Sequence, residues 1–437
     1  MLHVLLGGLI VPVPAFAEIW AVIPLLSGVY YILKNRNKHN EAAYWAAYYV
    51  GLELLLRMTE GYITWEFGKY ATILLLGLGF VVETRRYRWK AVWCVVVVLL
   101  LIPGILDTLT WSDSVRDDVL FNTSGMLTLA TAAGYFYGRP FRFAAIKRLI
   151  SWFLLPVVSV CVYLFFRTPD LQSIEFTTRA NFATSGGFGP NQVASVLGAA
   201  WVFFLCYYLY KEKLTPRRTI DLLLFALVLF RSLLSFSRGG NYAAVIALFG
   251  FLLVHVISRD SHVVSKKVFV SLLVATAVSI TAVVMINNVT QGVFANRFTG
   301  RNMEGEMRED VTTGRLRLLQ EEWQLFKEHP LGLGAGGSAA SRAIESGRSI
   351  ATHNEFGRLL SEHGVLGLII IVLMIVYPIR HYFKWKVTDS RSFLVLLCSL
   401  ALATMMHSAL RLALPAFLYG LSMVCMLPRE EDSVHRK

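Results

Sequence analysis

Long apolar stretches recur along the whole chain, and they limit its possible folds more than any other feature of the sequence. A membrane-spanning helix needs about 20 mostly apolar residues, and backbone polar groups in lipid must find partners inside the protein. The sequence therefore predicts an all-α polytopic membrane protein with about twelve transmembrane helices. The apolar runs lie near 41–58, 69–83, 91–110, 119–138, 148–166, 189–210, 219–236, 239–258, 267–287, 364–379, 392–408 and 412–427.

The composition excludes a soluble or disordered chain. Only 16% of the 437 residues are charged, against about 25% in soluble globular proteins, and the mean hydropathy is +0.54. The five cysteines lie in apolar runs without a Cys-x-x-Cys pair, so we interpret them as small buried hydrophobic residues, and no metal site is predicted. They are Cys94, Cys161, Cys206, Cys398 and Cys425.

The placement of lysine and arginine predicts the orientation of the chain. Alternate connections between the apolar runs are basic and together hold 25 of these residues, whereas the short connections between them hold one or two each. Because basic loops stay on the cytoplasmic side, the basic connections and the C-terminus are predicted to be cytoplasmic. The net charge of +13 is therefore mainly a topology signal, and nucleic acid is not an expected partner. The basic connections are 34–40, 84–90, 138–148, 211–218, 258–267, 380–391 and 428–437.

Three parts follow from this pattern. Residues 1–287 hold the N-terminal transmembrane helices, and residues 364–437 hold the C-terminal ones with a short cytoplasmic tail. Residues 288–363, here called the outer loop, form a long extracytoplasmic segment with helical patterning. Residues 1–33 are a further apolar segment without a basic start, so a retained, kinked or re-entrant segment is favoured over a cleaved signal peptide.

The outer loop contains a predicted helix with arginines in its first turn. Leu316, Leu319, Trp323 and Phe326 recur at helical spacing after Thr312-Thr313-Gly314, which indicates one apolar stripe. The positive end of the helix dipole disfavours a cation there and favours a bound anion. Arg317 is interpreted as solvated, whereas for Arg315 a solvated and an anion-binding role are equally open.

A capping-box pattern follows in the same loop. Thr352-x-x-Glu355 precedes an apolar run, which predicts a helix whose first residue is His353. The helix end would keep its imidazole neutral near pH 7, as a general base requires; the alternative is a helix-start histidine without a role. The glycine-rich stretch 331–338 lacks the strand and the Gly-Lys-Ser/Thr of a nucleotide loop, so we interpret it as a flexible turn.

Two shorter outer connections also carry arginines. Arg231 and Arg238 are seven residues apart, which predicts one shared helix face; a snorkelling role is credible for Arg231 and less so for Arg238. Arg179 precedes a Gly-rich stretch that leads to Pro190-Asn191 at a helix start, where backbone N–H groups can approach an anion. A plain polar loop is an equally good interpretation of that stretch.

The predicted topology places Arg179, Arg238, Arg315 and His353 on the outer face, on three different loops. Cations that converge there beside one possible base favour a membrane-borne anion as the ligand, and a pyrophosphate on a lipid would fit. Arginines would hold the pyrophosphate by bidentate bonds, and His353 would activate an attacking hydroxyl.

In these motifs the sequence resembles the O-antigen ligase and polymerase superfamily. The resemblance rests on Ser235-Phe-Ser-Arg238-Gly-Gly, Thr313-Gly-Arg315, Pro330-x-Gly-x-Gly and His353-Asn354 followed after nine residues by Gly364-Val-Leu-Gly367. It covers residues 179–367 by motif and the whole chain by its many spans and large outer loop.

The resemblance implies a GT-C-like glycosyltransferase of the bacterial inner membrane, with its active site facing the periplasm. The donor would be a glycan on undecaprenyl pyrophosphate and the acceptor a lipid A–core sugar, with membrane lipids around the protein and no cofactor or nucleotide. His353 would act as base, Arg238 and Arg315 would bind the pyrophosphate with Arg179 as a weaker candidate, and Asn354 or Asn191 would position His353 or the acceptor.

Two other functions stay open. A polymerase would extend the glycan on its lipid carrier with the same donor, although the nine residues between Arg179 and Gly189 do not match the Arg-x10-Gly loops often described for polymerases. A transporter of lipid-linked glycan would need no base and would favour charges deep in the membrane. Glu53, Arg57 and Arg231 are the main ones in the apolar runs, and two of these lie near run ends.

Overall fold

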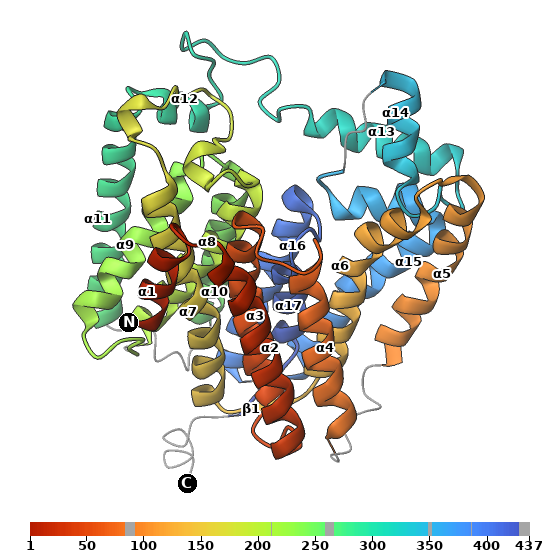
Figure 1. The fold of residues 1–437 in the computed structure, drawn as a ribbon, viewed down its shortest axis with the longest axis horizontal. Helices are drawn as coiled ribbons and strands as arrows, with labels where there is room; N and C mark the ends of the chain where they lie inside the picture. The colour runs from red at the N-terminus through yellow and green to blue at the C-terminus, as the bar shows by residue number, and fades with distance from the viewer. Residues whose placement is uncertain (84–91, 211, 258–265, 348–351, 386, 428–437) are drawn as a thin grey trace.

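The computed structural model describes residues 1–83, 92–210, 212–257, 266–347, 352–385 and 387–427. Among them are seventeen α-helices and a single pair of two-residue strands (Figure 1). The predicted basic segments 84–90, 258–267 and 428–437 lie wholly or mostly outside the described residues, as do Lys211 and Lys386.

The N-terminal part of the chain, up to the outer loop, is a succession of helices. They are α1 (Leu2–Leu9), α2 (Ala15–Asn35), α3 (Glu41–Met58), α4 (Phe67–Val82), α5 (Val92–Trp111), α6 (Val115–Phe136), α7 (Phe143–Arg167), α8 (Pro190–Leu209), α9 (Arg218–Leu234), α10 (Arg238–Ile257) and α11 (Lys266–Val289). Two 3-10 turns, Leu171–Ser173 and Ala183–Ser185, shape the connection from α7 to α8.

The outer loop contains α12 (Val293–Thr299), α13 (Arg315–Glu328) and α14 (Gly337–Ser346), and then α15 (Glu355–Lys384), α16 (Thr388–Ser408) and α17 (Ala413–Ser422) follow. Helix α15 begins within the predicted outer loop and is broken at Gly364, where the predicted span begins. Strand β1 (Pro140–Phe141) pairs in parallel with β2 (Cys425–Met426).

The prediction of an all-α membrane protein is confirmed in its main feature. All twelve predicted runs coincide with helices, and eight of the described helices are long and apolar enough to cross a membrane: α2, α5, α7, α8, α10, α11, α15 and α16. Helices α4 and α17 are apolar but shorter. The inclusion of α2 makes residues 15–35 a helix of spanning length, with Pro24 inside it.

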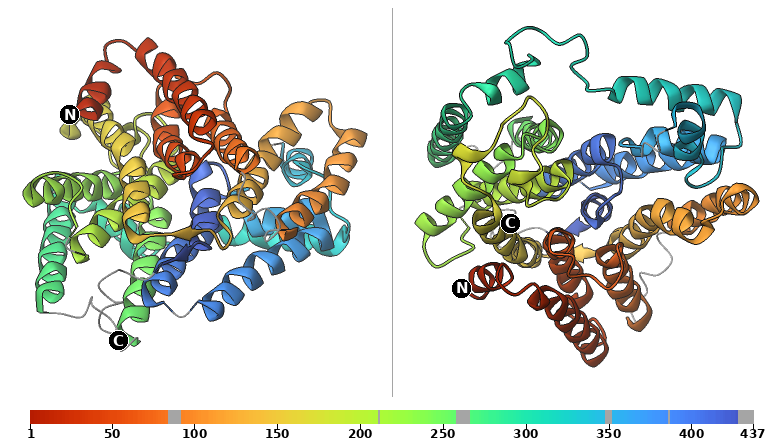
Figure 2. Two further views of the ribbon diagram at one scale, coloured as in Figure 1. Left: turned by 90° about the horizontal axis from the view of Figure 1, so that it is seen from below. Right: turned by 45° about the horizontal axis from the view of Figure 1, so that its top comes forward.

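The outer loop joins two sides of the helix bundle. Helices α12, α13 and α14 lie at one end of the molecule, and β1, within the predicted cytoplasmic segment 138–148, lies at the opposite end (Figure 1). The chain between α12 and α13 crosses from the side of α9 and α11 to the side of α5 and α15 (Figures 1 and 2). Residues on both sides of this crossing are therefore available to one site.

Small residues allow α8 and α10 to pack closely. Ala194 and Gly198 on α8 face Gly240 and Ala244 on α10, a small-xxx-small pair of the kind that lets membrane helices approach. A Cβ on Gly240 would lie 2.4 Å from the carbonyl carbon of Ala194. The glycine that follows Arg238-Gly239 is therefore required by packing, and this contact fixes the start of α10.

A cluster of buried charges ties α3 to its neighbours. Arg57 donates to Glu53 at 2.9 Å and to Glu66 at 3.0 Å, and Lys69 pairs with Glu66 at 2.7 Å. Glu53 also accepts from the backbone N–H of Ala413 at 2.7 Å. All four charged side chains are buried, and each cation has a carboxylate partner. Such pairing is the condition for tolerating charge in a low-dielectric interior.

We expect Gly240→Ala to destabilise the protein, because the new methyl group would overlap backbone atoms of α8 that cannot move aside. The cost of such overpacking is about 1–3 kcal/mol. Thermal unfolding of the purified protein would measure it. Gly77→Ala is the matched control, because a Cβ at that helical glycine meets nothing within 4 Å. Equal unfolding temperatures for the two variants would contradict the proposed packing.

Candidate functional site

His353 lies just before α15, and the predicted cap is wrong by two residues. Asn354, not Thr352, is the N-cap: its side chain accepts from the N–H of Phe356 at 2.9 Å and of Gly357 at 3.5 Å. The hydroxyl of Thr352 instead accepts from Arg342 at 2.8 Å. His353 is therefore not the first helical residue, and Asn354 fixes the helix end beside it.

The imidazole of His353 is held neutral, as predicted, but by a different cause. Burial, and after it the charges of Arg411 and Arg315, lower the pKa of His353 to about 4. Arg411 lies close by, since it donates to the carbonyl of Thr352 at 2.9 Å. Burial, together with the surrounding cations, therefore lowers the pKa of this ring and keeps a lone pair available on it at neutral pH.

Arg315 and Arg238 approach the site from different elements. Arg315 is the first residue of α13, which begins after Gly314 as the sequence predicted. Arg238 is the first residue of α10, and its guanidinium donates to the carbonyls of Arg297 and Val311. Burial, and then the charge of Arg238, lower the pKa of Arg315, which places the two cations within interaction range.

Two further arginines belong to this group, and the sequence analysis did not single them out. Arg297 on α12 donates to the carbonyls of Phe236 at 3.3 Å and Thr178 at 3.1 Å. Arg308 also donates to the carbonyl of Thr178, at 2.8 Å. Burial, and then the charges of Arg238 and Arg308, lower the pKa of Arg297 to about 10. No motif marks either residue, so only the fold could reveal them.

Arg179 and Asn191 lie at the outer edge of the same region. Arg179 is exposed, and Asn191 accepts from the hydroxyl of Ser237 at 2.8 Å, next to Arg238 in the chain. Asn191 thus holds the turn that carries Arg238. In the described structure no hydrogen bond joins Asn191 to His353, which favours a donor-side over a histidine-positioning role.

The structure brings all six predicted site residues to two adjoining cavities. A cavity of about 420 Å³ is lined by Arg238, Arg315, His353 and Asn354, and one of about 1210 Å³ by Arg179, Asn191, Arg315 and His353. Because Arg315 and His353 line both, we treat them as one region, the cationic cavity.

The cationic cavity has an excess of positive charge, because seven arginines and three carboxylates, Asp310, Glu321 and Glu322, line it. Among the described residues, no ion pair involves Arg179, Arg238, Arg297, Arg308 or Arg315. The carboxylate of Asp310 is used at the start of α13, where it accepts from the N–H groups of Thr312 and Gly314. Arg317 is 84% exposed and pairs with Glu321, as expected for a solvated side chain. This excess of positive charge favours an anionic ligand.

Three predictions around the site need correction. Arg231 and Arg238 do not share a helix face, because α9 ends at Leu234 and α10 begins at Arg238; Arg231 is buried and donates to Thr168. The glycine-rich stretch is ordered, not a loose turn: Leu333 and Gly334 donate backbone bonds to α15.

The third correction concerns α13, whose predicted apolar stripe is largely exposed. Leu316 and Trp323 are 54% and 51% exposed, whereas the buried residue of this helix is Glu322, at 1%. Within the described structure neither oxygen of Glu322 has a hydrogen-bond partner, and the nearest ion-pair contact is Arg342 at 3.9 Å. Burial raises the pKa of Glu322 to about 7.

We expect Glu322→Gln to stabilise the protein at pH 8. A carboxyl whose pKa rises from 4.5 to about 7 on folding makes the folded state less stable as pH increases through that range, and the amide removes this penalty. Unfolding temperatures at pH 5 and pH 8 would show a gain of roughly a few degrees at pH 8 only. Glu328→Gln, an exposed change on the same helix, is the control. A pH-independent effect would exclude this explanation.

One comparison with known proteins gives a match, and it overlaps part of this site. The family described as O-antigen ligase matches residues 222–372, a range that contains Arg238, Arg315, His353 and Asn354 but not Arg179 or Asn191. No curated protein and no solved structure matches the chain, so the GT-C-like architecture stays a prediction. Over residues 222–372 this membrane protein is therefore similar to the O-antigen ligase family.

Proposed function

We propose that this protein is an O-antigen ligase. It would transfer a glycan from undecaprenyl pyrophosphate to a sugar hydroxyl of lipid A–core, on the periplasmic face of the bacterial inner membrane. The observation that carries the proposal is the cationic cavity, in which arginines without carboxylate partners surround one neutral histidine. The family match supports the class of reaction but does not distinguish the acceptor.

The proposed reaction needs a base for the acceptor hydroxyl and cations for the leaving pyrophosphate. The acceptor oxygen bonds to the anomeric carbon of the donor glycan, and the bond from that carbon to the pyrophosphate oxygen breaks. The hydroxyl proton passes to the imidazole of His353, and undecaprenyl pyrophosphate leaves with the electron pair. Arg238, Arg315 and Arg297 would stabilise the charge that develops on the leaving group.

Donor binding also explains how a histidine with a low pKa can act as a base. The cations that depress the pKa of His353 are Arg411 and Arg315, together with Arg342. A pyrophosphate bound among arginines would offset part of their field and raise the basicity of the imidazole. The base would therefore become effective only when the donor is in place, which limits unproductive proton transfer in the empty site.

The apolar side of the cavity suits a lipid-linked donor. Tyr242, Leu316 and Met406 line the smaller part of the cationic cavity and are each about half exposed, at 48%, 54% and 58%. On α10, a spanning helix, exposed Val245 and Phe249 continue from Tyr242 down the same helix face. A polyprenyl chain could follow this face while its pyrophosphate lies among the arginines.

A polymerase that elongates the glycan on its lipid carrier is the second candidate. It would use the same donor, the same arginines and the same base, and the family match supports both activities equally. The two reactions differ only in where the acceptor hydroxyl comes from. A transporter is disfavoured, because it would leave His353 without a reason to be kept neutral beside the arginines.

Transfer by the purified protein tests the proposal. We expect undecaprenyl-pyrophosphate glycan and lipid A–core to give glycosylated lipid A–core without nucleotide, and His353→Ala to lower the rate by roughly 100-fold or more while the affinity for undecaprenyl pyrophosphate stays nearly unchanged. His329→Ala, an exposed histidine at the end of α13, should transfer normally. Longer glycans on the carrier, with no lipid A product, would identify a polymerase. Unchanged turnover in His353→Ala would remove its role as base.

Donor affinity tests the arginines. We expect Arg315→Lys and Arg238→Lys each to weaken binding of undecaprenyl pyrophosphate by roughly tenfold, because an ammonium keeps the charge but loses the bidentate contact. Titration of the purified variants with this lipid would measure the change. Arg301→Lys is the control, since Arg301 is exposed, lines neither part of the cationic cavity and donates to the carbonyl of Gly305. If all three variants bind like the wild type, the cationic cavity does not hold the donor.

A further inference from the structure

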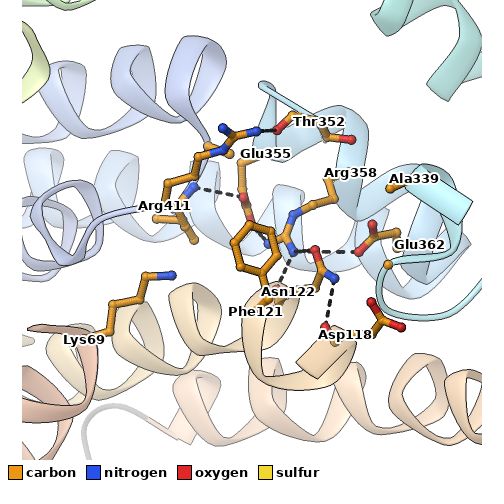
Figure 3. A pocket seen from close by; sticks show the side chains of 13 residues that line it. Lys69, Asp118, Phe121, Asn122, Ala339, Thr352, Glu355, Arg358, Glu362 and Arg411 are labelled. Atoms are coloured by element: carbon orange, nitrogen blue, oxygen red, sulfur yellow. Dashed lines mark hydrogen bonds and ion pairs between the residues drawn. The ribbon is translucent and has the colours of Figure 1, made fainter. Parts of the chain in front are cut away.

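A separate cavity is lined by Thr352, the residue that precedes the histidine. This polar chamber has a volume of about 160 Å³, roughly ten times the ~10–15 Å³ that one water requires on the same measure. Thr352 lines the polar chamber, and His353, the next residue, lines the cationic cavity. The chamber walls come from α4, α6, α15, the region of α14 and the turn before α17: Lys69, Asp118, Phe121, Asn122, Gly336, Ala339, Thr352, Glu355, Arg358, Glu362, Ala409, Leu410 and Arg411 (Figure 3).

The electrostatics of the polar chamber differ from those of the cationic cavity. Its lining includes three cationic side chains and three carboxylates. Arg358 bonds to Glu355 and to Asn122 and lies 3.7 Å from Glu362, so the charges are largely balanced within the chamber (Figure 3). A balanced lining gives no net attraction for an anion, but it offers both hydrogen-bond donors and acceptors.

Small residues form the chamber wall where the glycine-rich stretch packs against α6. Gly336 has a φ of +88°, and a Cβ there would lie 3.0 Å from the amide nitrogen of Asn122 and 3.4 Å from Asp118. Ala339, one turn later, also lines the chamber with a small side chain. The space therefore exists because small residues occupy one wall, and a larger side chain at position 339 would fill it.

Polar atoms at the chamber lack partners. In the described part of the chain, neither Oε2 of Glu362 nor Nε of Arg358 has a hydrogen bond, although both side chains are more than nine-tenths buried. Leaving such groups unpaired costs about 1–3 kcal/mol each. In the same chamber, Phe121 presents a ring that is 42% exposed. The chamber lining as a whole combines charged and amide side chains with an exposed aromatic residue, which is the mixture expected of a small-molecule pocket.

We infer that the polar chamber binds an uncharged, hydroxyl-rich sugar residue of the acceptor. The inference rests on the proposed function and adds to it the place of the second substrate. A hydroxyl can donate and accept at once, so a sugar ring suits a lining of carboxylates, guanidinium groups and an amide. The donor pyrophosphate would lie in the cationic cavity, where positive charge is in excess. The base would thus lie close to both substrates.

Arg411 connects the chamber with the histidine. It lines the chamber, donates to the carbonyl of Thr352 at 2.9 Å, and its charge is the largest single charge that acts on His353. A sugar that bonds to Arg411 would therefore lie within reach of the segment that carries the base. This contact gives a direct structural route by which the acceptor could be oriented toward the imidazole.

Filling the chamber tests the inference. We expect Ala339→Leu to raise the acceptor KM by roughly tenfold or more, while the affinity for undecaprenyl pyrophosphate stays at the wild-type value. Ala340→Leu adds the same bulk to the next position of α14, outside the chamber lining, and should leave the acceptor KM unchanged. The acceptor is lipid A–core, or the carrier-linked glycan if the wild type uses that. Phe121→Ala, which removes the ring without filling the space, provides a second variant should Ala339→Leu fail to fold.

Release of glycan to water separates a binding role from a structural one. A chamber variant that only weakens acceptor binding should still release glycan to water as slowly as the wild type does without acceptor. A variant that displaces His353 should lose this release and should also have a lower kcat. A wild-type acceptor KM in both chamber variants, or a loss confined to kcat and release, would overturn the inference. A wild type that neither binds undecaprenyl pyrophosphate nor transfers glycan would instead reject the proposed function.

Discussion

The compensation of buried cations at the outer end of the bundle determines how the rest of this structure is organised. Arg57, Lys69 and Arg358 each pair with a carboxylate nearby in the chain. Further bonds of the same groups join separate elements: Arg57 also pairs with Glu66, Glu53 accepts from Ala413 on α17, and Arg358 donates to Asn122 on α6. Arg297 and Arg308 are bound by backbone carbonyls instead. Since a carbonyl supplies only a partial charge, the second group keeps most of its positive field. Arginine thus stabilises the packing of helices in one place and supplies uncompensated positive charge in another.

This division also governs the histidine. An imidazole beside uncompensated arginines loses affinity for a proton, because its charged form is repelled and poorly solvated. The neutral ring that results is the form that a general base needs, although its basicity in the empty protein is low. A bound pyrophosphate would correct that weakness without any movement of the protein. Preorganised charge of this kind is the commonest large contribution to enzymatic rate enhancement.

The sequence was sufficient for the fold class and for the residues that local patterns mark. Apolar runs predicted helices, and the arginine of Thr313-Gly-Arg315 and the histidine of Thr352-His353 stand at helix ends that composition signals. Local patterns could not reveal Arg297, Glu322 or Arg411, because their importance comes from packing between distant segments. The predicted cap is wrong because Thr352 and Asn354 are both good N-cap residues. The bonds that Asn354 accepts from the helix start, and the contact of Thr352 with Arg342, decide between them.

His353 lines the cationic cavity and Thr352 lines the polar chamber, so the proposed base lies close to both proposed substrates. An enzyme that activates a hydroxyl beside a reactive anomeric carbon must also prevent water from taking the same place. The cationic cavity is wide and open to solvent, so it cannot exclude water by itself. The polar chamber is much smaller and is lined by Thr352, the residue before His353. If the acceptor sugar fills the chamber, its hydroxyl is held at the base by many bonds, whereas a water molecule there gains only a few. Selection of the acceptor over water would then follow from the shape of the chamber, while the arginines supply the rate.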